Sequence, residues 1–100
     1  MGEVDEMFKR IMTIKGVQAA VAMTADGIVI RSTMEQSNAV HYAAMYAPLV
    51  QESRMAVSEL GGNNVKTIRL RTGKHEVIII PGKLYHFLVI QQPDASFDGP

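Results

Sequence analysis

The stretch EVIIIPGKLYHFLVIQQ, residues 76–92, contains two strongly apolar runs joined by a turn at Pro81-Gly82-Lys83. Each run is rich in β-branched and aromatic residues, so we predict two antiparallel strands, over Glu76 to Ile80 and Leu84 to Gln92. Both strands are apolar on both faces, which indicates that each face of their sheet is covered. One face would present Ile78, Ile80, Phe87 and Val89, and the other would present Val77, Ile79, Leu88 and Ile90.

A third strand is predicted just before this pair, over Val65 to Thr72, followed by a turn at Thr72-Gly73-Lys74-His75. Its side chains alternate, with Ile68 and Leu70 on one side and Thr67, Arg69 and Arg71 on the other. Such alternation is typical of a strand with one solvated face, and the charges suit the edge of a sheet. The three strands together form a predicted antiparallel meander.

A β-hairpin is predicted nearer the N-terminus, where Val17 to Met23 and Ile28 to Ile30 flank an Asp26-Gly27 turn. Alanine is a poor strand former, so this prediction depends on the turn and its flanks. The small side chains of Ala19, Ala20 and Ala22 would allow a helix to approach the first strand closely.

Two helices complete the predicted fold. The first ends near Gly16, and its apolar residues repeat at the helical interval: Val4, Met7, Phe8, Ile11 and Met12. The second runs from a cap at Ser37 or Asn38 to Leu60, and Pro48 near its middle predicts a kink or a local break. Its apolar residues form two lines, so it needs cover on more than one side. One line is Tyr42, Met45, Leu49, Ala56 and Leu60, and the other is Ala39, Ala43, Tyr46, Val50 and Val57.

These elements predict an α/β fold of the α+β type, in the order α-β-β-α-β-β-β, with one five-stranded antiparallel sheet and a helix on each face. A chain of 100 residues that is 47% apolar and 20% charged fits a single globular domain. We place this domain at residues 1–94. Residues 95–100 are expected to be a flexible tail, because the sequence after Gln92 has two prolines and no periodicity.

The composition argues against several classes of function. Ten basic and ten acidic residues give a formal net charge of zero, so no overall field favours nucleic acid or an anionic membrane. The absence of cysteine excludes disulfides, thiolate metal sites and cysteine nucleophiles. No signal sequence or membrane-spanning run is recognisable, so we expect a cytoplasmic protein.

No pattern of catalytic residues stands out either. His41, His75 and His86 lack the spacing of a metal site, and no serine sits in a nucleophile elbow. Gly73-Lys74 and Gly82-Lys83 lack the upstream glycine of a phosphate-binding loop. We therefore expect no enzyme activity, cofactor, metal or small-molecule substrate. His86 lies in an apolar strand, where it could report pH if it faces an interface.

The helix count leaves apolar sheet surface without cover. Five strands make a sheet roughly 20 to 24 Å wide, whereas one helix covers about 10 Å. Two copies of the edge strand pairing antiparallel would hide both edges, although Lys66, Arg69 and Arg71 disfavour such pairing. We predict a homodimer whose interface contains residues of this strand and of the second helix. They are Val65, Thr67, Arg69, Arg71, Tyr46, Val50, Arg54 and Val57.

Several short motifs match a known family in their order and spacing. They are Gly16-Val17-Gln18, Asp26-Gly27-Ile28, Ile30-Arg31-Ser32-Thr33-Met34, Tyr42-Ala43, Arg54, Ile68-Arg69-Leu70-Arg71, Lys74-His75-Glu76 and Ile90-Gln91-Gln92-Pro93. From about Val4 to Asp94 the chain resembles the roadblock family of dynein light chains. The resemblance implies a homodimer with a continuous ten-stranded sheet and paired long helices, which binds a helical segment of the dynein intermediate chain. It also implies a role in motor assembly and cargo attachment for microtubule-based transport, in the cytoplasm or in the axoneme of a cilium or flagellum.

Relatives in the wider superfamily carry a third helix after the last strand, whereas this chain has Pro93 and a short tail. We expect the intermediate chain to supply the missing helix, against Val4, Met7, Phe8, Ile11, His86, Leu88 and Ile90. Pro48, Gly61-Gly62 and Phe97 depart from the family pattern. The alternative hypothesis is a scaffold or regulator of small GTPases, as some distant relatives of this fold are.

Overall fold

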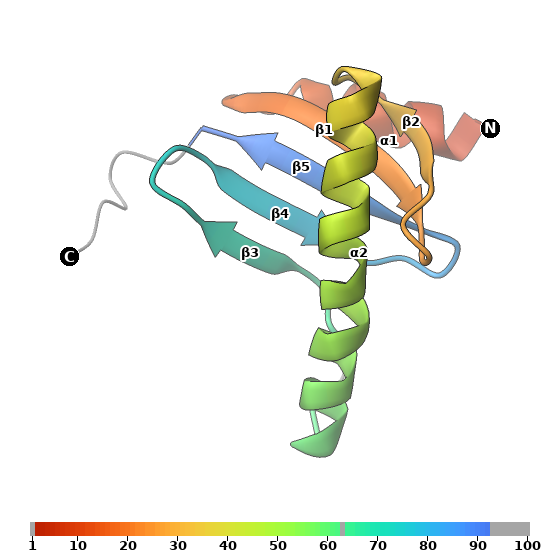
Figure 1. Cartoon of the computed structure of the whole chain (residues 1–100), viewed down its shortest axis with the longest axis vertical. Coiled ribbons are helices and arrows are strands. Elements are labelled where there is room, and N and C mark those ends of the chain that lie inside the picture. The colour runs from red at the N-terminus through yellow and green to blue at the C-terminus, as the bar shows by residue number, and fades with distance from the viewer. Residues whose placement is uncertain (1, 63, 93–100) are drawn as a thin grey trace.

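The computed structural model describes residues 2–62 and 64–92, and the structural statements below concern those residues. Its elements follow the predicted order α-β-β-α-β-β-β (Figure 1). They are α1 (Gly2–Met12), β1 (Val17–Thr24), β2 (Val29–Ser32), α2 (Gln36–Glu59), β3 (Ile68–Arg71), β4 (Glu76–Ile80) and β5 (Tyr85–Gln91). The five strands form one antiparallel sheet in the spatial order β2-β1-β5-β4-β3.

The last strand of the chain, β5, lies at the centre of this sheet. Its residues His86 to Ile90 are all buried, because β1 and β4 flank it and helices cover both faces. Val89 lies opposite Ala20 on one side and opposite Ile78 on the other. A strand that is apolar on both faces loses the most solvent-exposed area at this position, which explains why the sequence places it there.

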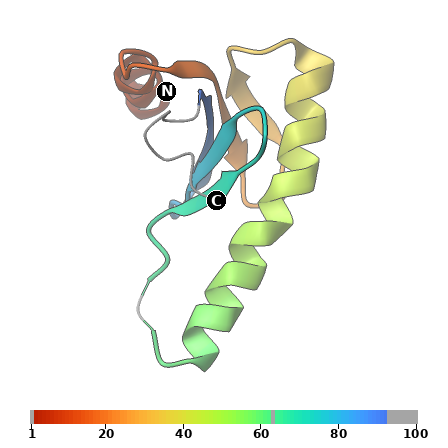
Figure 2. The ribbon, with the colours of Figure 1, turned by 90° about the vertical axis from the view of Figure 1, so that its left-hand side faces the viewer.

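The two helices lie on opposite faces of the sheet, which gives three layers (Figure 2). The buried residues of the α1 face are Val4, Phe8, Ile11, Ala20, Ala22, Phe87 and Val89. Those of the α2 face are Val21, Met23, Ala39, Ala43, Ala47, Val50, Val77, Ile79, Leu88 and Ile90. Ile78 and Ile80 are partly buried on the α1 face. The predicted division of residues 76–92 between two faces is therefore confirmed.

Helix α1 is amphipathic, as predicted, and Val4, Phe8 and Ile11 form its buried side. Met12, expected on the same side, is exposed, because the helix ends there. Asp5 forms an ion pair with Arg31 of β2, and the Arg31 guanidinium lies 5.2 Å from the centroid of the Phe8 ring. These contacts hold α1 against the outer strand of the sheet.

The predicted hairpin between β1 and β2 is confirmed, and its turn also packs against α2. Gly27 has a φ of 86°, a conformation that residues with a Cβ rarely adopt. A Cβ at this position would lie 3.1 Å from the Ala43 carbonyl oxygen and 3.2 Å from the Ala47 Cβ. The turn therefore needs glycine both for its conformation and for its close approach to the helix.

Helix α2 runs without interruption for 24 residues, close to the predicted length. Its N-cap is Glu35, not Ser37 or Asn38 as predicted: the Glu35 carboxylate accepts hydrogen bonds from the Ser37 hydroxyl and backbone N–H. These bonds lower the pKa of Glu35. Pro48 is exposed and the helix continues past it, so the expected local break does not occur. Figure 2 shows the helix axis changing direction along its length, in agreement with a kink.

The strand boundaries differ slightly from those predicted. β3 begins at Ile68, so Val65 to Thr67 approach the sheet without joining it, while β4 has the predicted bounds. The predicted tail, residues 95–100, lies outside the described residues, as does the end of the predicted domain. No helix in the described part of the chain combines the length and the hydropathy needed to cross a membrane.

Candidate functional site

The C-terminal part of α2, residues 51–59, lacks support from the rest of the chain; it is called the second half of the helix below, and residues 36–50 the first half. Its last buried residue is Val50, and from Gln51 to Glu59 only Ser53 and Val57 are even partly buried. Figure 1 shows this half extending past the edge of the sheet. A helix that projects in this way gains little from the packing that normally stabilises protein helices.

An apolar strip, here called the helix stripe, follows the outer side of α2. It consists of Tyr42, Met45, Tyr46 and Leu49, which with His41 line a shallow hollow. The Tyr42 and Tyr46 rings stack with their centroids 5.8 Å apart. Met45 is 62% exposed, although a thioether side chain is favourably buried. Ala39, Ala43, Ala47 and Val50 cover the sheet, and Tyr42, Tyr46 and Leu49 pack against the margin of the same core while staying only partly buried.

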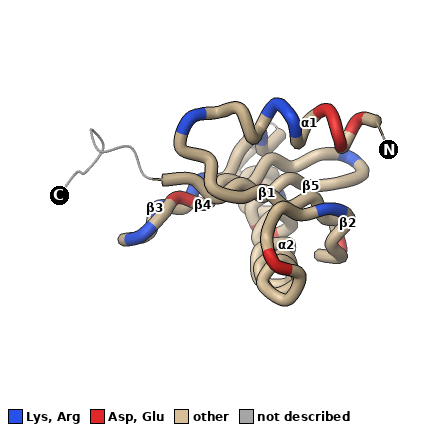
Figure 3. Tube along the Cα trace, turned by 90° about the horizontal axis from the view of Figure 1, so that it is seen from above, with Lys and Arg blue, Asp and Glu red and all other residues tan. Residues whose placement is uncertain are grey.

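Strand β3 forms the edge of the sheet past which the second half of α2 extends (Figure 1). It pairs with β4 alone, so within the described residues its other edge is open. Figure 3 shows basic positions along β3 next to an acidic position on β4. An open strand edge beside an unburied helix is the arrangement that a second copy of the chain can complete.

Seven of the eight predicted dimer residues are accessible in the structure, and one is buried. Arg54, Thr67, Arg69 and Arg71 are exposed, and Tyr46, Val57 and Val65 are partly buried, so all seven are accessible to a second chain. Val50 is 2% exposed and packs in the α2-face core. Its predicted place in an interface is therefore wrong, because the side chain is already covered by the sheet.

His86 of the central strand β5 is part of a small polar cluster with Arg54 of α2 and Gly82 of the turn between β4 and β5. Its Nδ1 accepts a hydrogen bond of 3.1 Å from the Gly82 backbone N–H, and Arg54 donates one of 3.3 Å from Nη2 to the Gly82 carbonyl oxygen. Burial of the imidazole, followed by the nearby positive charge of Arg54, lowers the pKa of His86. Arg54 and Gly82 also line a hollow with Ser58, Gly62, Asn64, Val65, Pro81 and Lys83.

The predicted partner-binding residues do not form one surface. Leu88 and Ile90 lie under α2, on the opposite face from α1, and His86 is buried on that face too. Their grouping with the α1 residues is wrong, because alternate residues of β5 point to opposite faces. Val4, Phe8 and Ile11 are buried between α1 and the sheet, so Met7 is the predicted α1 residue that a partner can reach.

A different apolar surface is open beside α1. A hollow, here called the α1 hollow, lies between this helix and the turn from β4 to β5, where Leu84 is 73% exposed. Its apolar lining is Met7, Ile80, Pro81, Leu84, Tyr85 and Phe87, and its polar lining is Glu3, Gly82 and Lys83. The sequence offered one signal for it: Ile78 and Ile80 are apolar on a face that one short helix cannot cover.

No metal site emerges from residues 2–62 and 64–92, which contain no group of three histidine or acidic side chains arranged to hold an ion. Every buried side-chain nitrogen or oxygen in this part of the chain has a hydrogen-bond partner. The accessible features are thus an open strand edge, an apolar helix stripe and an apolar hollow. Surfaces of these kinds are typical of contacts with another chain.

Comparison with known proteins identifies the family. The model of the Roadblock/LC7 domain matches residues 3–92, so the chain belongs to the Roadblock/LC7 family. The Roadblock/LC7 domain from Streptomyces avermitilis superposes with a TM-score of 0.79 at 20% identity, over 89% of this chain and 78% of that one. MglB from Myxococcus xanthus superposes with a TM-score of 0.72 at 16% identity, over 83% of this chain and 70% of that one. An MglB structure with a tetrameric arrangement superposes with a TM-score of 0.76 at 10% identity, over 91% of this chain and 71% of that one. At these identities the structures establish a shared fold.

Proposed function

We propose that this chain is a non-catalytic dynein light chain that acts as a homodimer. In this role it binds a helical segment of the dynein intermediate chain and helps to assemble the motor and attach its cargo. The observation that carries the proposal is the apolar surface left accessible on both sides of the molecule. The helix stripe is only partly covered on the α2 side, and the α1 hollow is open on the α1 side.

The open edge of β3 is the proposed dimer joint. Two β3 strands paired antiparallel across a two-fold axis would satisfy each other's free backbone groups and join two five-stranded sheets. The same operation would bring the projecting halves of the two α2 helices together. The exposed side chains of Met45 and Met55, at 62% and 59%, would then have a surface to pack against.

The α1 hollow is the proposed site for the intermediate-chain helix. Its apolar walls match the way an amphipathic helix inserts anchors spaced three or four residues apart. Met7 and Leu84 are the accessible side chains on its rim, and Ile80 and Phe87 form its floor. Such a helix would lie beside α1 and cover the part of the sheet that α1 leaves open.

The assignment to dynein rests on the ordered motifs, from Gly16-Val17-Gln18 to Ile90-Gln91-Gln92, within a domain of the matching family. In this role the protein would act on microtubule motor complexes in the cytoplasm, or in the axoneme of a cilium or flagellum. It would need no cofactor, because its contribution is to bring two copies of a partner segment together.

The proposal is tested by titrating a peptide with the light-chain-binding segment of an intermediate chain into the purified protein in a calorimeter. Saturable binding at micromolar concentration, with one peptide per chain, is expected. No saturable binding in that range would reject the dynein assignment. Replacing Leu84 with Asp should weaken binding. Ile28, on the β1–β2 hairpin, is 64% exposed against 73% for Leu84, so Ile28→Asp provides the matched control.

The alternative, a scaffold or regulator of small GTPases, has the support of a fold shared with MglB. Pull-down with nucleotide-loaded GTPases separates the two hypotheses. Retention of a GTPase in only one nucleotide state, together with no peptide binding, would favour the alternative.

A further inference from the structure

The α1 side of strands β3, β4 and β5 has an apolar half and a polar half. At one end Ile80 lies opposite Phe87, next to the α1 hollow. At the other end Arg71 lies opposite Glu76, which in turn lies opposite Gln91. Arg69 is between them, opposite Ile78. A segment that crosses this face therefore meets aliphatic side chains first and charged side chains next.

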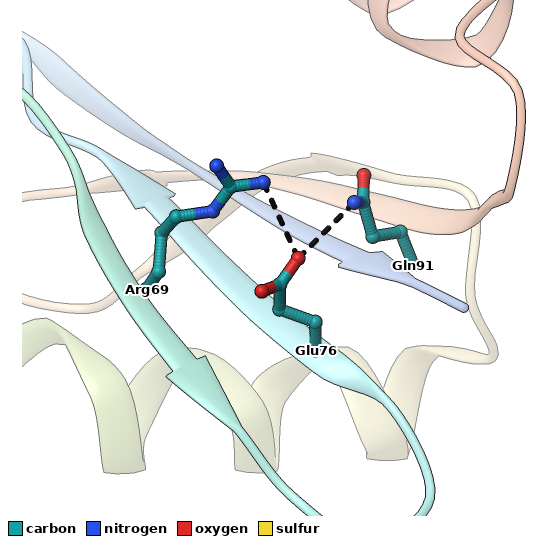
Figure 4. Close-up of polar contacts among 3 residues, drawn as sticks. All are labelled: Arg69, Glu76 and Gln91. Atoms are coloured by element: carbon teal, nitrogen blue, oxygen red, sulfur yellow. Dashed lines mark hydrogen bonds and ion pairs between the residues drawn. The ribbon is translucent and has the colours of Figure 1, made fainter. Parts of the chain in front are cut away.

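The polar half holds the Arg69 guanidinium in place. Figure 4 shows one Glu76 oxygen, Oε1, accepting hydrogen bonds from Arg69 Nη2 at 3.3 Å and from Gln91 Nε2 at 3.1 Å. The Arg69 side chain is 58% exposed, whereas that of Glu76 is 16% exposed. This contact uses one of the five guanidinium N–H donors, and the others have no hydrogen-bond partner among the described residues. Arg69 is thus oriented by the protein but still able to bind a further anion.

Pairing of two β3 strands would concentrate this charge. A two-fold axis perpendicular to the sheet places Arg69 of both copies on the same face. Because β3 is only four residues long, both side chains lie near that axis. Two guanidinium groups so close together repel each other, and each Glu76 oxygen that reaches Arg69 is already shared with Gln91. The centre of the dimer face would be positive, with an apolar patch of Ile78 and Ile80 on either side.

We propose that this face selects an acidic amphipathic helix. Its apolar residues would lie over Ile78 and Ile80, and a carboxylate of the same helix would pair with Arg69 near the two-fold axis. The inference rests on the proposed function, because both the dimer and the helical partner are taken from it. It adds the chemistry of the partner: acidic side chains are required at the end of the helix that lies nearest the axis. A carboxylate suits the guanidinium because it accepts two parallel N–H donors.

The test compares Arg69→Gln with Lys9→Gln, since Lys9 is exposed on α1 and both changes remove one positive charge. Each variant is titrated with the intermediate-chain peptide and with a version in which its acidic residues are changed to amides. At about 0.05 M salt, R69Q should bind the acidic peptide roughly fivefold more weakly than the wild type, and K9Q should bind it unchanged. At about 0.5 M salt the difference should largely disappear. R69Q should not discriminate between the two peptides.

The outcomes separate this inference from the function on which it rests. The acidic-helix inference is overturned, and the proposed function stands, if the wild type and R69Q bind the acidic peptide equally well. The same holds if the losses of binding free energy from R69Q and from the amide changes in the peptide simply add. If the wild type binds no peptide, both are overturned. If sedimentation shows that R69Q no longer dimerises, the affinities of the wild type for the acidic and the amide peptide are compared instead. Equal wild-type affinities for the two peptides overturn the inference. Binding of a DNA duplex in place of the peptide would also overturn it.

Discussion

Residues 36–50 and 51–59 of α2, its first and second half as named above, have different surroundings. In the first half, Ala39, Ala43, Ala47 and Val50 are buried against the sheet. In the second half no residue is buried, and the exposed side chains include Met55. One continuous helix is thus supported by its own chain at one end and unsupported at the other. Because a helix gains most of its stability from packing, the second half points to a contact that a single chain does not provide.

The largest effect should come from placing a charge in each half. We expect Val50→Asp to cost about 4 kcal/mol of unfolding free energy or more, because Val50 is 2% exposed and a carboxylate there would have no partner. That is a large fraction of the roughly 5 to 15 kcal/mol by which a domain of this size is stable. Val57→Asp, in the second half, should leave the circular dichroism spectrum unchanged and lower the dimer fraction. Equal unfolding of both variants would show that the two halves depend on the same core.

Two glycines sharpen the comparison at the level of the backbone. Gly27 and Gly61 both have positive φ, at 86° and 76°, but only Gly27 packs against α2. We expect Gly27→Ala to cost roughly 2 to 3 kcal/mol, from backbone strain plus the close contact with Ala43. Gly61→Ala should cost roughly 1 kcal/mol, because no atom lies within 4 Å of its Cβ. Urea unfolding of both variants measures the difference, and equal costs would contradict the packing argument.

The helix stripe predicts a smaller effect, confined to assembly. Met45→Lys should weaken dimerisation about tenfold to hundredfold without unfolding the chain, because Met45 is exposed in the monomer and central to the stripe. Val40→Lys is the matched control, since Val40 is 50% exposed but lies outside the stripe. Sedimentation of both variants over a concentration series provides the measurement. A similar loss of dimer in both would show that the stripe is not the contact.

The smallest effect concerns pH. The pKa of His86 is lowered in the folded protein, chiefly by burial and also by Arg54, so the folded state binds a proton less readily than the unfolded state. The contribution of neutral His86 to the free energy of unfolding is therefore complete above the pKa of His86 in the unfolded state. It is lost as the pH falls through the pKa of His86 in the folded state. Protonation would also remove the acceptor for the Gly82 N–H. Urea unfolding at pH 7 and pH 5 should show a loss of stability that His86→Gln reduces. An unchanged pH dependence in that variant would contradict this role.

Much of the fold could be predicted because local patterns and global packing agree. The alternation in Val77 to Ile80 and Phe87 to Ile90 assigned each residue to its correct face. The Asp26-Gly27 turn fixed the first hairpin, and the glycine pair after Leu60 fixed the end of α2. Each of these signals needs only neighbouring residues to be interpreted.

The candidate surfaces were predicted less well than the fold, because they depend on which side of α2 packs against the sheet. Tyr46 and Ala39 were placed on one line, but the sheet packs against Ala39, Ala43 and Ala47 and leaves Tyr46 partly exposed. Large side chains on the sheet, Met23, Ile79 and Leu88, fill the interior, so the helix contributes small ones there. Hydropathy alone does not express this size complementarity. For the same reason, it could not show which helix covers Leu88 and Ile90.

The central claim is that the open edge of β3 and the unsupported half of α2 are completed by a second copy of the chain. Sedimentation equilibrium of the purified protein at micromolar concentration tests it most directly. The account predicts a mass twice the 11.0 kDa of one chain, shifting toward that of one chain in Met45→Lys. A stable species of 11.0 kDa at every concentration, with its helical content intact, would contradict it.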